Sequence, residues 1–162
     1  MTFGFTRLKS LAGLLTLCLA GTLGAQIATK KALTLEAAKK IAAAAEAEAL
    51  KNKWTVVIAI VDDGGNLLYL QKMDGTQIAS IEIAQFKARS AVGFKRPTKE
   101  LGDRLTGGAT YLLKVPWAAP FEGGVPLVVG GELVGAIGIS GMSSQQDGVA
   151  AAAGVAVAAA LK

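Results

Sequence analysis

Two stretches of the chain each have the pattern of a β-hairpin, and they restrict the possible fold more than any other feature. In "VVIAIVDDGGNLLYLQKM", residues 56–73, a β-branched run precedes turn residues and a second apolar run. In "FEGGVPLVVGGELVGAIGISG", residues 121–141, two β-rich runs flank Gly130-Gly131, a pair that supplies the positive φ angles of a tight turn. Together these stretches predict an antiparallel sheet built from two related hairpins.

The glycines of residues 121–141 have a second possible interpretation, a phosphate-binding loop. Gly135, Gly138 and Gly141 recur at every third position, which does not match G-x-G-x-x-G, and no lysine follows as in a P-loop. We therefore interpret them as strand glycines that a helix approaches closely. We expect that helix to be the C-terminal one.

Helical patterns surround the hairpins and predict helices on both faces of the sheet. The predicted helices are residues 33–53 with Thr34 as N-cap, residues 79–97 ended by Pro97, a short helix beginning at Thr98 or Asp103, and residues 143–162 capped by Ser143 or Ser144. Residues 105–120 are expected to form an irregular loop across a pocket mouth.

The first residues have the layout of a secretory signal peptide. Arg7 and Lys9 precede an apolar run that is too short for a confident membrane span, and small residues follow it. We predict a signal peptide over residues 1–25, one domain over residues 26–162, and a periplasmic or secreted location without membrane attachment after cleavage. The alternative is an uncleaved N-terminal anchor.

The composition excludes several kinds of chemistry. The chain has no histidine, and its only cysteine, Cys18, lies within the predicted signal peptide. His-based triads, His- or Cys-ligated zinc and disulfides are therefore excluded from the mature chain. The net charge of +5 is modest, and no basic run with interleaved aromatics predicts nucleic-acid binding. We expect no catalytic residues and a protein that is not an enzyme.

Candidate ligand-binding residues lie on and after the second predicted helix. Lys87 and Arg89 could grip a carboxylate, or they could belong to a solvated helix face. Near the helix end, Arg96 could clamp an anion while Phe94 stacks on a flat ligand, with Thr98 beside them. The alternative is an amphipathic helix terminus.

A third candidate is the loop before the second hairpin. Gly123 and Gly124 would let the backbone approach a ligand or a neighbouring subunit. If Glu122 is buried it needs a cationic partner, for which Lys87 or Arg96 are the candidates. Otherwise Glu122 is an exposed loop acid.

Six stretches of the chain, taken in order, carry a family resemblance: "LTLEAAKKIAAAAEAEA", "VVIAIVDDGGNLLYLQKMDG", "SIEIAQFKARSA", "FKRPTKEL", "FEGGVPLVVGGELVGAIGISG" and "SSQQD". They resemble the GlcG/HbpS-like family of haem-binding proteins, and the same domain is similar to the C-terminal part of PduO-type corrinoid adenosyltransferases. The resemblance covers essentially all of residues 26–162. It implies a profilin-like α/β/α sandwich around a five-stranded antiparallel sheet, and a homo-oligomer ranging from a dimer to an octamer.

The resemblance also implies a ligand. Some members of this family bind haem and one is an extracellular redox-sensing partner, so we expect an exported haem- or tetrapyrrole-binding protein that acts in haem handling or redox sensing. This chain cannot supply a histidine to haem iron, which leaves oxygen or sulfur ligands. The alternatives are a small-acid-binding accessory protein of glycolate-type metabolism and an oligomeric protein-interaction module. Tyr111 and Trp117 could form a ligand wall or a subunit contact, and the resemblance to a ring-forming family favours the contact.

Overall fold

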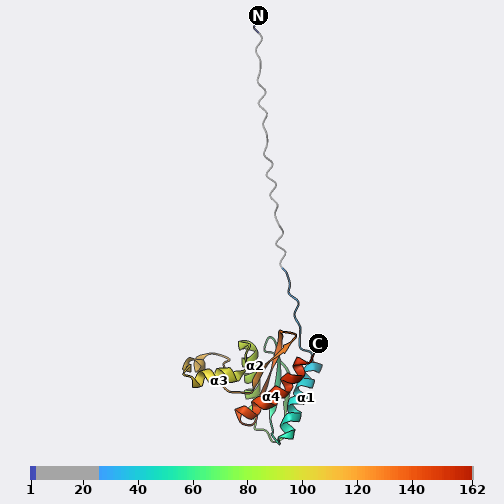
Figure 1. Ribbon diagram of the computed structural model, residues 1–162, viewed down its shortest axis with the longest axis vertical. Helices are drawn as coiled ribbons and strands as arrows, with labels where there is room; N and C mark the ends of the chain where they lie inside the picture. Colours follow the sequence, from blue (N-terminus) through green and yellow to red (C-terminus); the bar gives the residue numbers. More distant parts are fainter. Residues whose placement is uncertain (3–25, 162) are drawn as a thin grey trace.

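The computed structural model of the protein describes residues 1–2 and 26–161. The predicted signal peptide therefore falls almost entirely outside the described residues, and its cleavage stays a prediction. From residue 26 an extended segment leads into the folded part of the chain, and the C-terminus lies at the end of the fold where this segment enters (Figure 1).

The helices and strands follow the order that the sequence predicts. They are α1 (Leu35–Lys51), β1 (Val57–Asp62), β2 (Leu67–Lys72), α2 (Ser80–Phe94), α3 (Thr98–Thr106), the 3₁₀-helix η1 (Thr110–Lys114), β3 (Gly124–Val129), β4 (Glu132–Ser140) and α4 (Ser144–Ala159). The predicted caps Thr34 and Ser143 are confirmed, since each side chain accepts a backbone N–H of the first helical turn. The expected irregular loop over residues 105–120 is wrong in part, because α3 extends into it and η1 forms within it.

The sheet is antiparallel, with strand order β2-β1-β4-β3. Each hairpin contributes two neighbouring strands, and β1 pairs with β4 to join the hairpins. The α/β/α class is confirmed, but the described residues contain four strands rather than the five that the resemblance implied. The two hairpins use all the β-rich runs, and the glycine- and proline-containing connection from α3 to β3 forms η1 and loops instead.

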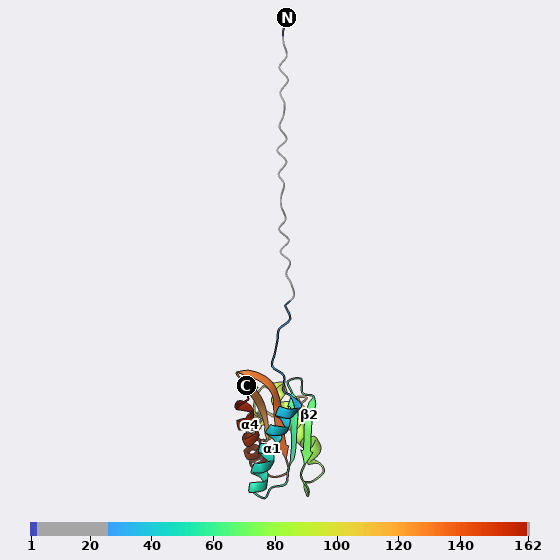
Figure 2. The same ribbon diagram turned by 90° about the vertical axis from the view of Figure 1, so that its right-hand side faces the viewer.

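Successive side chains of β1 point to opposite faces of the sheet. Ile58 and Ile60 point into the main core under α1 and α4, while Val57, Ala59 and Val61 face α2. Figures 1 and 2 show α1 and α4 side by side on one face of the sheet, with β2 at its edge. The prediction of helices on both faces is thus confirmed. In Figure 1, α3 projects sideways from this three-layer body.

Strand β4 is approached closely by a helix at Gly138, as predicted, but the helix is α2 rather than the expected C-terminal α4. For Gly135 and Gly141 the prediction was wrong, because a Cβ atom there would clash with the backbone carbonyl oxygens of Val61 and Thr55 instead of a helix. A Cβ atom on Gly138 would clash with the backbone carbonyl oxygen of Ala84 and lie 2.6 Å from the backbone nitrogen of Ala88. On the opposite face, α4 brings its own glycine, Gly154, against Ile137. The correction follows from alternation, because Gly138 points to the α2 face and Ile137 to the other.

Gly138→Ala should destabilise the fold strongly, because its new methyl group would meet backbone atoms that can yield only if the whole of α2 moves. Overpacking of this kind typically costs about 1–3 kcal/mol, and a backbone clash should put the loss at the upper end. Urea denaturation monitored by circular dichroism measures it. The matched control is Gly107→Ala, at an exposed helix end with a negative φ, which should unfold close to wild type. Equal midpoints for the two variants would contradict the close contact.

Candidate functional site

Lys87 lies on the buried face of α2, and its side chain is only 2% exposed. Ala84 and Ala91 share this face. The solvated-face interpretation is therefore wrong for Lys87. Arg89 points elsewhere, since it is half-buried beside Gly65 in the turn between β1 and β2. Lys87 and Arg89 therefore do not converge on one binding site for a carboxylate.

The partner of Lys87 is Asp147, in the first turn of α4. The Lys87 Nζ atom lies 2.7 Å from Asp147 Oδ2 and donates a second hydrogen bond of 2.9 Å to the carbonyl of Ile139. The other carboxylate oxygen of Asp147 accepts the backbone N–H of Met142 at 3.0 Å. Both charged side chains are 2% exposed. Because α2 and α4 cover opposite faces of the sheet, this ion pair joins the two outer layers.

Burial dominates the electrostatics of the Lys87–Asp147 pair. Desolvation lowers the pKa of Lys87 below its ordinary value, although the hydrogen bond and charge of Asp147 pull it back upward. Desolvation likewise raises the pKa of Asp147 against the opposing effect of Lys87. A buried pair with this balance gives little net stability, yet removing one partner is costly because the other charge is left uncompensated. The pair also links α2 to α4, since each helix supplies one of its two side chains.

The loop before β3 passes directly over this pair, and Gly123 is the residue that allows it. Gly123 has φ +124°, and a Cβ atom there would lie 2.7 Å from Lys87 Nζ and 2.9 Å from Asp147 Cβ. Its carbonyl accepts the N–H of Ile139 at 2.9 Å. Glycine is thus required here by both backbone conformation and lack of space.

Gly124 and Thr98 form the next part of the same cluster. The N–H of Gly124 donates to Thr98 Oγ1 at 2.9 Å, and a Cβ atom on Gly124 would lie 2.7 Å from Thr98 Cγ2. Thr98 is completely buried at the start of α3. The candidates Lys87, Thr98, Gly123 and Gly124 therefore do come together, but they do so inside the protein.

Glu122 does not make the predicted ion pair. Lys87 pairs with Asp147, and Arg96 faces Glu100 of its own segment at 3.9 Å. Glu122 is half-buried against Gly148 of α4, and its charge adds only a weaker attraction to Lys87. The prediction was wrong because Asp147, in the first turn of α4, supplies the carboxylate that pairs with Lys87.

Phe94 and Arg96 lie apart from this cluster, at the junction of α2 and α3. Phe94 packs against Leu101 and Leu112 in a small satellite core. Arg96 Nε donates to the carbonyl of Phe94 at 3.2 Å. No contact in the described residues links either side chain to Lys87, and their roles as ligand contacts stay predictions.

Two residues of the cluster, Asp147 and Phe121, were not predicted from the sequence. Asp147 is the only charged residue in residues 143–161, and a lone carboxylate in an otherwise apolar helix was the signal for a buried partner. Phe121 covers the pair, with its ring centroid 5.4 Å from Lys87 Nζ and 6.3 Å from the ring of Phe86. Nothing in the sequence alone brings Phe121 to the lysine.

Two open cavities lie elsewhere on the described surface. One, of about 390 Å³, lies where the N-terminal segment meets α1 and the β3–β4 turn; Lys31 and Lys40 line it, each with a carboxylate within 4.0 Å. The other, of about 460 Å³, lies between the end of α1 and the end of β2, with Trp54, Met73, Lys53 and Lys72 in its lining. Both volumes fall in the range of small-molecule sites.

The described residues give no sign of two other kinds of site. They contain no group of three or more acidic, Cys or His side chains placed to hold a metal ion. Among them, no helix combines the length and apolar character needed to span a bilayer.

The geometry defines a three-layer α/β/α domain with a sealed ionic cluster and separate open cavities. The sequence model of the family described as "Haem degrading protein HbpS-like" matches residues 33–156. The chain belongs to this HbpS-like family.

Similarities to known proteins support the assignment to this family. Protein GlcG of Escherichia coli K12 is 43% identical over 112 residues, which span 69% of this chain and 84% of GlcG. A double mutant of Streptomyces reticuli HbpS superposes with a TM-score of 0.75 at 37% identity, covering 85% of this chain and 97% of HbpS. The PduOC:heme complex superposes with a TM-score of 0.72 at 31% identity, covering 78% and 95% of the two chains.

Lys87→Met should destabilise the protein by about 3–5 kcal/mol, because it leaves Asp147 charged and buried. The double variant Lys87→Met/Asp147→Asn should recover part of this loss, since asparagine carries no charge and can still accept the N–H of Met142. Urea denaturation of the three proteins measures both effects.

The exposed pair Lys99–Asp103, with an N–O distance of 2.8 Å, provides the control. Lys99→Met should leave the unfolding midpoint almost unchanged, because solvent screens that pair. A double variant less stable than Lys87→Met alone would contradict the role of the buried pair.

Proposed function

We propose that this protein binds haem or a closely related tetrapyrrole. The observation that carries the proposal is the 31% identical haem complex of PduOC, which shares the fold over 78% of this chain. The HbpS-like family description supports it independently. The sealed Lys87–Asp147 cluster leaves no space for such a ligand, so the open cavities are the candidate sites.

We propose further that the chain supplies binding and orientation rather than a catalytic side chain. Residues 26–162 contain no histidine or cysteine, so a nucleophile–base pair of the usual kinds is absent from this sequence. The family description names haem degradation. Any such chemistry would be supplied by the bound group, while the protein would hold the group in place.

Hemin titration tests the binding proposal. Adding hemin to the purified protein should give a saturable shift of the Soret band, whereas the same titration into urea-unfolded protein should resemble free hemin. A spectrum identical to free hemin with the folded protein would refute the proposal. Thermal stabilisation by a small hydroxy acid, without any hemin response, would favour the metabolite-binding alternative.

Export of the protein is a second part of the proposal, supported by the basic start and short apolar run of residues 1–25. Together with haem binding, export would suit a role in haem handling or redox sensing outside the cytoplasm. Intact-mass analysis of protein recovered from the periplasm or medium should give a chain that begins close to Gln26. Recovery of a chain that retains Met1 would count against cleavage.

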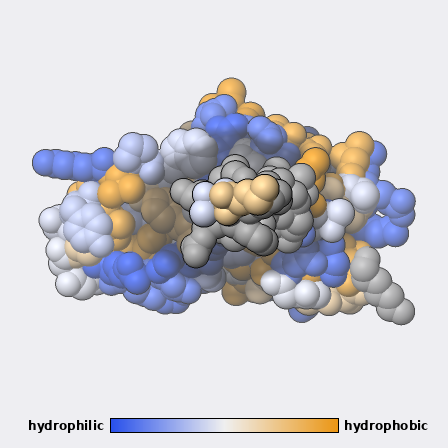
Figure 3. Space-filling model, turned by 90° about the horizontal axis from the view of Figure 1, so that it is seen from above, coloured by the Kyte–Doolittle hydropathy of each residue, from blue (hydrophilic) through white to orange (hydrophobic). Residues whose placement is uncertain are grey.

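We also propose a homo-oligomer. Tyr111, Leu113 and Trp117 are each more than half exposed around η1, and Figure 3 shows other hydrophobic residues exposed at the end where the N-terminal segment leaves. Apolar surface of this kind is commonly covered by a partner. Light scattering should therefore give a mass of at least two chains at micromolar concentration. A purely monomeric mass would contradict this expectation.

A further inference from the structure

The cavity between the end of α1 and the end of β2 has one wall that is fixed by a helix-terminating motif. The N–H of Trp54 donates to the carbonyl of Ala49, and the N–H of Lys53 donates to the carbonyl of Leu50. This pair of bonds is the Schellman arrangement, which ends α1 and turns the chain sharply. Trp54 is consequently held against the main core, half-buried, with part of its side chain at the cavity.

Lys53 occupies the position in this motif where glycine is usually found. Its φ is +58°, a left-handed conformation that is unfavourable for residues with a Cβ atom. Lys95 adopts the same conformation, φ +52°, at the end of α2. A left-handed lysine therefore does not by itself indicate a site, but only Lys53 lines a cavity with an aromatic wall.

Two lysines at this cavity are placed to meet a ligand that carries carboxylates. Lys53 and Lys72 are exposed, and neither has a carboxylate within 4.0 Å among the described residues. Two acids, Glu46 and Asp74, also line the cavity, and both would oppose an anionic ligand. Glu46 accepts a hydrogen bond from Gln71 Nε2 at 2.5 Å, which orients its carboxylate without neutralising the charge. In the other cavity, by contrast, both lysines already face carboxylates.

We propose that the cavity formed by Trp54, Met73, Lys53 and Lys72 is where this chain binds its tetrapyrrole. This inference rests on the proposed function and gives it a location. The flat face of the ligand would lie against the half-buried Trp54, beside the 9% of Met73 that is exposed, and its carboxylates would meet the ammonium groups of Lys53 and Lys72. Recognition by face and carboxylates requires no histidine, which agrees with the absence of that residue from the chain.

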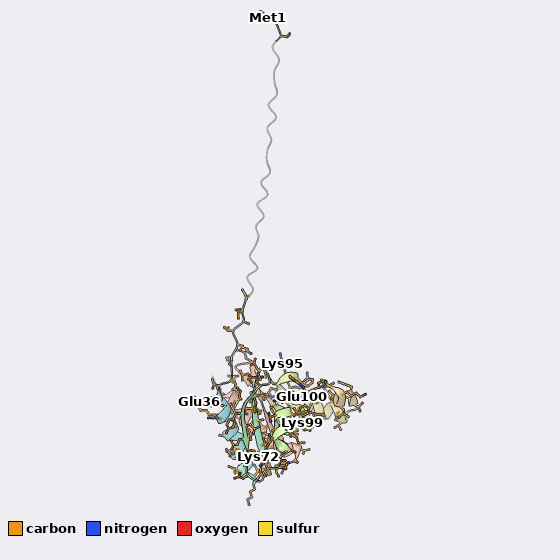
Figure 4. The ribbon with its side chains drawn as sticks, turned by 180° about the vertical axis from the view of Figure 1, so that it is seen from behind. Met1, Glu36, Lys72, Lys95, Lys99 and Glu100 are labelled. Atoms are coloured by element: carbon orange, nitrogen blue, oxygen red, sulfur yellow. The ribbon has the colours of Figure 1, made fainter. Side chains whose placement is uncertain are left out.

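The first experiment compares Lys53→Gly with Lys95→Gly. Both variants place glycine at a left-handed position that suits it, so both should fold at least as stably as wild type. The two sites are well separated, because Lys95 ends α2 near the β1–β2 turn and Lys72 lies at the other end of β2 (Figure 4). Fluorescence titration with metal-free protoporphyrin IX and absorbance titration with hemin measure the affinities.

Lys53→Gly should weaken the binding of both porphyrins about two- to fivefold, the effect expected for one partly exposed ion pair. The double variant Lys53→Gly/Lys72→Gln should weaken it about tenfold. Lys95→Gly should bind as wild type does. Asp74→Asn should bind about twofold more tightly, because it removes one of the two acids that oppose the ligand. The dimethyl ester of protoporphyrin, which lacks both carboxylate charges, should bind weakly and equally to all variants.

The outcomes separate the site from the function. If wild-type protein does not bind hemin at all, the proposed function fails. If it binds hemin while the Lys53 and Lys72 variants bind equally well, the function stands and this location is wrong. A loss confined to Lys95→Gly would also overturn the location and place the ligand at the end of α2. Binding of hemin without any binding of metal-free protoporphyrin would overturn recognition by face and carboxylates.

Discussion

The ion pair between Lys87 and Asp147 is the interaction on which the arrangement of the layers depends. Sheet hydrogen bonds hold the strands together, but they do not fix how a helix on one face is placed relative to a helix on the other. Lys87 does this directly, because its ammonium group bonds to β4 and to α4 at once. The close approach of α2 to Gly138 makes that reach possible. The loop before β3 can pass over this pair only because residue 123 is a glycine, which has no Cβ atom to clash with it.

This dependence explains why the sequence identified the right residues but assigned them the wrong interaction. Lys87, Thr98, Gly123 and Gly124 share the features of a ligand site, namely a cation, a hydroxyl group and flexible backbone. A sealed structural cluster has the same composition, since a buried lysine needs acceptors and a crowded loop needs glycine. Only the burial of Lys87 and its pairing with Asp147 distinguish the two cases. That information depends on contacts between residues 60 positions apart in the chain.

The fold itself was far more predictable than the site. Hairpin turns and helix caps are local signals, so the element order and the caps at Thr34 and Ser143 could be predicted from short stretches. The choice of helix that approaches Gly138 could not be, because it depends on which face of β4 each residue occupies. The strand count came from the resemblance rather than from the residues. Both differences lie in tertiary arrangement, where a single sequence contains the least information.

The separation of the sealed cluster from the open cavities has a consequence for how a ligand could act on this fold. A group bound between α1 and β2 touches the main core through Trp54 and Met73, whereas the Lys87–Asp147 pair fixes the opposite layer to α4. Both α1 and α4 pack into that main core, so the two regions are connected through one set of buried side chains. Ligand binding would therefore stabilise the whole domain by mass action without any need to open the ionic cluster. A fold in which the layers are fixed independently of the ligand can retain its structure while the cavity residues change, because the buried contacts that hold the layers together do not involve the cavity lysines.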